Sequence, residues 1–237
     1  MADGTGAAAP GALALLGVER RPEPEAGEGV ERLRLRTAEG DIEGRLHAPP
    51  PGAAPSDAAI LWVFGSGGGL GGPAGGVYTR LGRRFAARGV ASLELAYRRP
   101  GRLRDCARDA LLGLAWLAGE GRGRVALVGH SFGGAVVVTV GAASPGVVAV
   151  APLSGQSAGT EAVADLAPRP LLVVHGTADE VLPDLCSRDL HARAREPKRL
   201  VLYRGCRHGL DECRDALDRD LSAWLAESLG LPAEGPP

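Results

Sequence analysis

The sequence predicts an α/β fold with a mostly parallel central sheet and helices on both of its faces. Short apolar runs alternate along the chain with longer segments of helical spacing, which is typical of consecutive β-α-β units. Two of these runs, residues 58–64 and 147–153, are apolar throughout, as expected for strands covered on both faces. The 237 residues suit a single domain of this kind.

The first regular segments differ from the later ones because they alternate apolar with charged residues. Residues 30–36 and 41–47 show this alternation, and residues 38–40 can turn between them. We therefore expect an antiparallel hairpin at one edge of the sheet. The later chain predicts strands at 58–64, 91–97, 125–128, 147–153, 171–175 and 199–203, and helices at 77–88, 103–118, 134 onward, 185–194 and 213–229.

The domain boundaries follow from composition. Residues 1–28 are rich in Ala, Gly, Pro and Glu and show little periodicity, so we expect a flexible N-terminal tail. Residues 29–230 then form one domain, and residues 231–237 form a flexible C-terminal tail. Only a short connection separates Leu153 from Pro170, which leaves no room for a cap domain.

Charge and hydropathy exclude several classes of partner. The formal net charge is -1, which argues against a nucleic-acid or membrane partner. No apolar run approaches the length needed to span a bilayer. Residues 12–18 are apolar, but they are short for a signal sequence and no basic residue precedes them, so secretion is not expected.

The four cysteines form neither a C-x-x-C pair nor a zinc-ligand spacing. We expect reduced thiols in a cytoplasmic protein, with a bridge between Cys206 and Cys213 as the alternative that their proximity leaves open.

A G-x-S-x-G motif at Gly129–Gly133 is the clearest chemical signal in the chain. It follows the β-prone run 125–128 and precedes the small apolar run 134–138. A serine on a sharp turn between a strand and a helix is exposed as a nucleophile, so Ser131 is the candidate. Chance is the alternative, because the chain contains 36 glycines.

A serine nucleophile needs a histidine base and a carboxylate that orients it. Such groups gather at the carboxyl ends of strands in open α/β sheets. Asp179 is the candidate acid because it follows the strand that ends at His175. The alternatives are a helix cap or a solvated turn, and Glu180 and Asp184 are nearby competitors.

His208 is the candidate base because it follows the last predicted strand, in a loop with a glycine on each side. The four other histidines are less suitable on position: His47 precedes Ser131, His130 adjoins it and would point away, His175 is expected to pack at a strand end, and His191 lies within a helix.

An oxyanion hole needs two inward backbone N–H groups. The residue after the nucleophile, Phe132, supplies one. The second is expected from the glycine-rich segment 65–72, at Ser66 or Gly67, because glycine lets backbone amides approach a ligand closely. A phosphate-binding loop is disfavoured because no lysine follows, and a plain flexible loop is the remaining alternative.

The order Ser131, Asp179, His208 with the G-x-S-x-G turn resembles the α/β-hydrolase family from about residue 30 to residue 229. The glycine-rich segment, residues 95–97 and residues 175–179 are similar to the dienelactone hydrolase and acyl-thioesterase branch. Two departures stand out. Phe64-Gly65 replaces the His-Gly of many relatives, and Ser131 stands where dienelactone hydrolases proper use cysteine, which argues against their substrate.

The resemblance implies a serine hydrolase that cleaves small carboxylic esters through an acyl-enzyme, with no metal or organic cofactor. The short connection before Pro170 favours small or exposed esters, with the glycine-rich segment and Tyr78 shaping one wall. An acyl-thioesterase, an acyltransferase, a small-peptide hydrolase and a non-catalytic hydrolase-fold binding protein are the alternatives. The oligomeric state cannot be read from the sequence.

Overall fold

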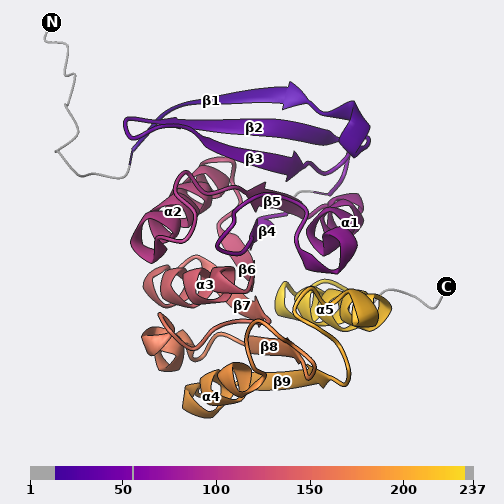
Figure 1. Ribbon diagram of the computed structural model, residues 1–237. Helices are drawn as coiled ribbons and strands as arrows, with labels where there is room; N and C mark the ends of the chain where they lie inside the picture. Colours follow the sequence, from indigo (N-terminus) through magenta and orange to yellow (C-terminus); the bar gives the residue numbers. More distant parts are fainter. Residues whose placement is uncertain (1–13, 55, 233–237) are drawn as a thin grey trace, which may run out of the picture.

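The computed structural model describes residues 14–54 and 56–232 and contains a nine-stranded sheet between two layers of helices (Figure 1). The strand order is β1-β2-β3-β5-β4-β6-β7-β8-β9. Neighbouring strands from β5 to β9 run parallel, so their carboxyl ends lie at one edge of the sheet. The α/β fold expected from the alternation of apolar runs and helical segments is confirmed.

Three antiparallel strands, rather than a hairpin alone, form the first edge of the sheet. They are β1 (Leu15–Pro22), β2 (Val30–Thr37) and β3 (Ile42–His47), and β3 continues antiparallel onto β5. The predicted hairpin is β2 and β3. The prediction of a tail over residues 1–28 is wrong for residues 15–22, which form β1, while residues 1–13 lie outside the described part. As an edge strand, β1 leaves Leu16 and Val18 exposed and lacks a clear apolar alternation.

The parallel strands inside the sheet are buried because helices cover both of their faces, whereas β9, at the edge, is only partly buried. Every residue of β4 is buried, and β8 is buried along its whole length as well. The six parallel strands are β4 (Ala58–Val63), β5 (Ala91–Leu95), β6 (Arg124–His130), β7 (Val147–Leu153), β8 (Leu171–Gly176) and β9 (Lys198–Tyr203).

Two hydrophobic cores lie on the two faces of the sheet (Figure 1). One face is covered by α2 (Leu103–Gly119), α3 (Phe132–Ala143) and α4 (Leu185–Arg193), and the other by α1 (Pro73–Ala87) and α5 (Arg214–Ser228). Within the described residues, no helix has the length and apolar character needed to cross a membrane. Short 3-10 helices occur at η1 (Pro24–Ala26), η2 (Glu161–Leu166) and η3 (Asp211–Cys213).

The connection between β7 and β8 does not form a cap over the sheet edge. Its only regular element among the described residues is η2, and Val163 and Leu166 of η2 are buried in the core with α3. The predicted absence of a cap domain is therefore confirmed.

A disulfide joins Cys206, just after β9, to Cys213, just before α5. The expectation of four reduced thiols is therefore wrong for this pair, although Cys106 and Cys186 are free. The two residues are seven apart in sequence, and the turn through η3 brings their Cα atoms to 5.9 Å, which suits a bridge. Disulfides are uncommon in the cytoplasm, so the cysteines no longer support the cytoplasmic location, which stays a prediction.

We expect the double variant Cys206→Ser/Cys213→Ser to have a free energy of unfolding lower by about 2 kcal/mol, because the unfolded chain is no longer constrained by the closed loop. Urea denaturation of the oxidised wild type and of the variant measures the difference. Cys186→Ser, which removes a free thiol and keeps the bridge, is the matched control. Equal stability of the double variant and the oxidised wild type would contradict the expectation.

Candidate active site

Ser131 lies on the turn between β6 and α3 with a backbone conformation that few side chains adopt. Its φ is 56° and its ψ is -122°, outside the regions normally open to non-glycine residues. β6 ends at His130 and α3 begins at Phe132, so Ser131 alone forms the corner. The side chain is only partly buried. The turn geometry expected for the G-x-S-x-G motif is therefore present.

The glycines of the motif are required by close backbone packing. A Cβ on Gly133 would lie 2.5 Å from the carbonyl oxygen of Phe64 and 2.9 Å from that of Val63, at the end of β4. A Cβ on Gly129 would overlap the carbonyl of Gly133 itself. Since real Cβ atoms do not approach backbone oxygens this closely, larger residues would push α3 away from the sheet.

Asp179 and His208 are brought together from two different strand ends. The Nδ1 atom of His208 lies 2.7 Å from Oδ2 of Asp179. The other oxygen, Oδ1, accepts hydrogen bonds of 2.8 Å from the backbone N–H groups of Val181 and Leu182. The Asp179 side chain has no exposed surface, whereas the His208 side chain is 16% exposed.

The carboxylate of Asp179 is stabilised in its charged form. Burial alone would raise its pKa, but the hydrogen bonds from Leu182, His208 and Val181 outweigh burial, and the pKa is lowered. Asp179 therefore stays ionised at neutral pH. It can hold His208 with the proton on Nδ1, which leaves Nε2 to act as a base.

The loop that carries His208 is held from several sides. The carbonyl of Cys206 accepts a 2.9 Å hydrogen bond from the N–H of Ala178. The carbonyl of His208 accepts one of 2.9 Å from Nε2 of His130. The His130 and His208 rings also lie 4.8 Å apart between centroids. The residue beside Ser131 therefore positions the histidine loop.

His130 was expected to point away from the site, but its buried ring, 5% exposed, packs against the ring of His208 and forms a hydrogen bond with the His208 carbonyl. Burial lowers the pKa of His130 to about 4. A carbonyl only accepts hydrogen bonds, so the neutral ring carries its proton on Nε2, where it donates to His208.

The glycine-rich segment runs directly over Ser131. A Cβ on Gly65 would lie 3.4 Å from the Cβ of Ser131. The N–H of Gly68 is used within the segment, where it donates to the carbonyl of Gly65 at 2.9 Å. In residues 14–54 and 56–232, no protein group accepts a hydrogen bond from the N–H of Ser66 or Gly67. Both predicted donors are therefore available, and the choice between them stays open.

Glu94, on β5, is a buried carboxylate that the sequence analysis did not single out. Its Oε1 lies 2.7 Å from Nε2 of His47 and accepts a 2.8 Å hydrogen bond from Thr79, while its Oε2 accepts one from the N–H of Gly71. Burial would raise the pKa of Glu94, but the contact with His47 and these hydrogen bonds lower it. Glu94 therefore fixes the far end of the glycine-rich segment.

The structure thus joins Asp179 to His208 by a direct contact. His130, the residue before Ser131, donates to the His208 carbonyl and so connects the Ser131 turn to the His208 loop. Within the described residues, no hydrogen bond joins the Ser131 hydroxyl to His208, a contact that often forms only with substrate bound. Tyr78 was expected in a wall of the site, but it is 1% exposed and its hydroxyl donates to the carbonyl of Val63. It supports the end of β4 instead.

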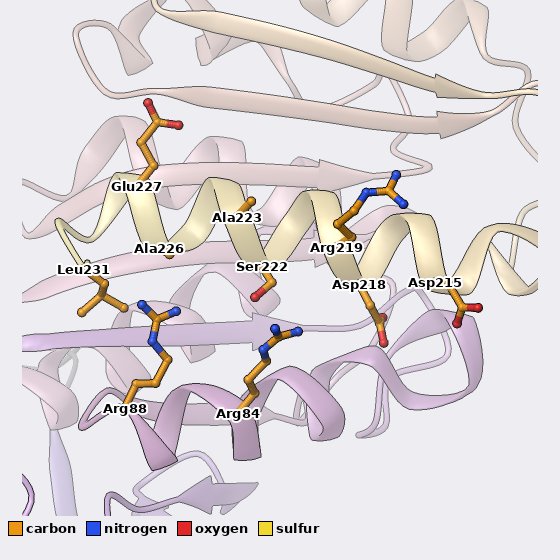
Figure 2. Close-up of a pocket in the computed structure, with 10 residues that line it drawn as sticks. All are labelled: Arg84, Arg88, Asp215, Asp218, Arg219, Ser222, Ala223, Ala226, Glu227 and Leu231. Carbon is orange, nitrogen blue, oxygen red and sulfur yellow. The ribbon is translucent and has the colours of Figure 1, made fainter. Parts of the chain in front are cut away.

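Of the larger cavities, one of about 700 Å³ lies between α1 and α5 and is lined by none of the candidate catalytic residues (Figure 2). Arg84 of α1 and Arg88, the residue after α1, point across it toward α5, which contributes charged residues of both signs, including Asp218 and Arg219. The described residues contain no group of three or more His, Cys, Asp or Glu placed to hold a metal ion.

The fold and the arrangement at the sheet edge define an α/β-hydrolase. The sequence profile of the dienelactone hydrolase family matches residues 74–224, and the chain belongs to this family. As a member of this family, the protein is a hydrolase.

Solved structures share the fold at low sequence identity. The esterase domain of a Rhodothermus marinus protein is 20% identical, with a TM-score of 0.69 over 85% of this chain and 99% of that chain. A dienelactone hydrolase from Anabaena variabilis is 19% identical, with a TM-score of 0.69 over 84% and 99%. An α/β serine hydrolase without a lid from Xanthomonas campestris is 18% identical, with a TM-score of 0.64 over 88% and 98%.

A stronger but shorter sequence match occurs with the uncharacterized protein YfhR of Escherichia coli. It is 48% identical over 44 residues, which are 19% of this chain and 16% of YfhR. The match therefore spans about a sixth of the length of YfhR and carries no information on the rest of that protein.

We expect Gly133→Ala to prevent correct folding or to abolish the Ser131 turn, because its Cβ would lie 2.5 Å from the Phe64 carbonyl. Thermal unfolding followed by circular dichroism measures the effect. Gly119→Ala, at the end of α2 with nothing within 4 Å of the added Cβ, is the matched control and should be neutral or more stable by about 0.5–1 kcal/mol. Similar stability of both variants would show that the packing tolerates a Cβ.

We expect His130 to make the free energy of unfolding decrease as the pH falls from 6.5 toward 4. The unfolded chain takes up a proton near pH 6.5, whereas the folded ring, with a pKa of about 4, does not. The stabilisation is therefore complete above pH 6.5 and decreases below it, by up to about 3 kcal/mol. Urea titrations at pH 7 and pH 4 measure it, with His130→Gln as reference. An identical decrease in the variant would exclude His130 as the source.

Proposed function

We propose that this protein is a serine-dependent hydrolase of small carboxylic esters that works through an acyl-enzyme. The observation that carries the proposal is the 2.7 Å contact between His208 Nδ1 and Asp179 Oδ2, at the sheet edge where the partly buried Ser131 lies on its strained turn. A buried, ionised carboxylate that orients a histidine, at the same sheet edge as a serine on such a turn, supports the chemistry of acyl transfer.

In the proposed reaction, Ser131 Oγ attacks the ester carbonyl carbon while His208 Nε2 removes its proton. Asp179 keeps the ring in the required tautomer and stabilises the imidazolium. His208 then returns the proton to the departing alcohol as the carbon–oxygen bond breaks, which leaves Ser131 acylated. A water molecule, deprotonated by His208, attacks the acyl group, and the acid is released as Ser131 regains its proton.

The negative charge that develops on the carbonyl oxygen is proposed to be held by two backbone N–H groups. Phe132 supplies one, because the first N–H groups of a helix have no partner within it and carry partial positive charge. The second comes from Ser66 or Gly67, whose N–H groups have no acceptor in the described part of the chain. Donors fixed by the fold stabilise the transition state without reorganising.

Two observations support esters of small or exposed acyl groups as substrates. The connection between β7 and β8 packs η2 into the core and does not form a cap domain. Val181 and Leu185, which follow Asp179, are large apolar side chains exposed by 61% and 66%, and they offer a surface for an apolar group of the ester. The proposed partner is therefore a small-molecule ester, without cofactor, nucleic acid or membrane.

We expect Ser131→Ala to lower kcat/KM for p-nitrophenyl acetate by at least about 10³-fold, because the nucleophile is lost while the oxyanion donors remain. Ser144→Ala, at the other end of α3, is the matched control and should keep wild-type activity. A fluorophosphonate probe should label the wild type and Ser144→Ala but not Ser131→Ala.

Equal turnover by Ser131→Ala would exclude Ser131 as the nucleophile. Wild-type protein that neither hydrolyses the ester nor reacts with the probe would favour a non-catalytic binding protein. Faster turnover of a thioester than of the matched oxygen ester would assign the protein to the thioesterases.

A further inference from the structure

The side chain of His175 contacts the same carboxylate that orients His208. His175 is the fifth residue of β8, four residues before Asp179, and its side chain has no exposed surface. Its Nε2 atom lies 3.0 Å from Oδ2 of Asp179, the oxygen that also contacts His208 Nδ1. The Asp179 carboxylate therefore lies between two imidazole rings.

The hydrogen bonds of His175 fix the position of its proton. Nε2 is 3.0 Å from the carbonyl oxygen of Leu182, which can only accept, so Nε2 carries the hydrogen. In the neutral ring Nδ1 is then an acceptor, and it lies 2.6 Å from the hydroxyl of Ser187 on α4, which donates to it. Ser187 is 2% exposed, so water does not compete for this bond.

The Leu182 peptide connects His175 to the other oxygen of the carboxylate. Its carbonyl accepts from His175, while its N–H donates to Oδ1 of Asp179 at 2.8 Å. The N–H group of His175 is directed at the Leu182 carbonyl and holds Oδ1 through that peptide unit, while Nε2 itself lies 3.0 Å from Oδ2. These contacts limit rotation of the Asp179 carboxylate. The orientation of this carboxylate sets the orientation of the His208 ring.

We propose that His175, held by Ser187, is a positioning residue that orients the Asp179 carboxylate toward His208. The proposal rests on the proposed function, because the orientation matters only if His208 acts as the base. His175 itself touches neither Ser131 nor the groups that would hold an oxyanion, so it acts on the reaction only through Asp179. The prediction that His175 packs at the strand end is correct, but it does not include the contact with Asp179.

The test compares variants of His175 that keep or remove a hydrogen-bond donor at the position of its Nε2–H group. We expect His175→Leu to lower kcat for p-nitrophenyl acetate by about 10- to 100-fold, because a displaced catalytic group loses about this much, with KM changed less than about twofold. His175→Gln, whose amide N–H can occupy the place of Nε2–H, should recover most of the loss. His191→Gln, on the same helix as Ser187, is the matched control and should keep wild-type kcat.

Ser187→Ala tests the same network without altering the ring. It removes the donor to Nδ1, so we expect a smaller decrease in kcat than in His175→Leu, again at nearly constant KM. This variant decides the question if His175→Leu does not fold. Proton NMR of the wild type should show a strongly deshielded N–H between His208 and Asp179, and this signal should weaken or move in both His175→Leu and Ser187→Ala.

The outcomes separate this proposal from the proposed function. Wild-type kcat in folded His175→Leu would overturn the proposal, as would equal losses in His175→Leu and His175→Gln or an unchanged NMR signal. Where His175→Leu does not fold, wild-type kcat in Ser187→Ala overturns it. If the wild type shows no ester turnover and no probe labelling, the proposed function itself is wrong.

Discussion

The close packing of two backbones, the end of β4 and the start of α3, is the constraint on which the site depends. Gly133 leaves no room for a side chain against the carbonyls of Phe64 and Val63, and Gly65 lies against Ser131 itself. This proximity brings the glycine-rich segment and the N-terminus of α3 to the same point. The strained conformation of Ser131 is maintained because β6 and α3 are both fixed by burial in the sheet and the core.

Two buried carboxylates stabilise the loops on either side of Ser131. Glu94 holds the glycine-rich segment through Gly71, and Asp179 holds the histidine loop through His208. Each carboxylate is costly to bury, and each has several hydrogen-bond partners that compensate for lost water. The glycine-rich segment and the histidine loop, which border the site, are therefore held in place by these hydrogen bonds.

The fold and the central residues of the site could be predicted because local patterns determine them. Continuous apolar runs identify buried parallel strands, and strands of this kind place their carboxyl ends together, which indicated Asp179 and His208. The strand β1 escaped prediction because an edge strand needs no apolar alternation, and Leu15–Pro22 shows none that is clear. The contacts of Glu94 and His175 could not be predicted from the sequence, because they depend on partners from other elements, such as His47 and Ser187.

The bridge between Cys206 and Cys213 encloses His208 in a covalent ring. Arg207 lies inside this ring and is exposed, so a protease that recognises arginine can reach a peptide bond next to the histidine. Cleavage there would leave β9 and α5 joined through the sulfur atoms rather than through the main chain. The nicked protein would migrate as one chain under oxidising conditions and as two after reduction, with Ser131 and His208 in different fragments.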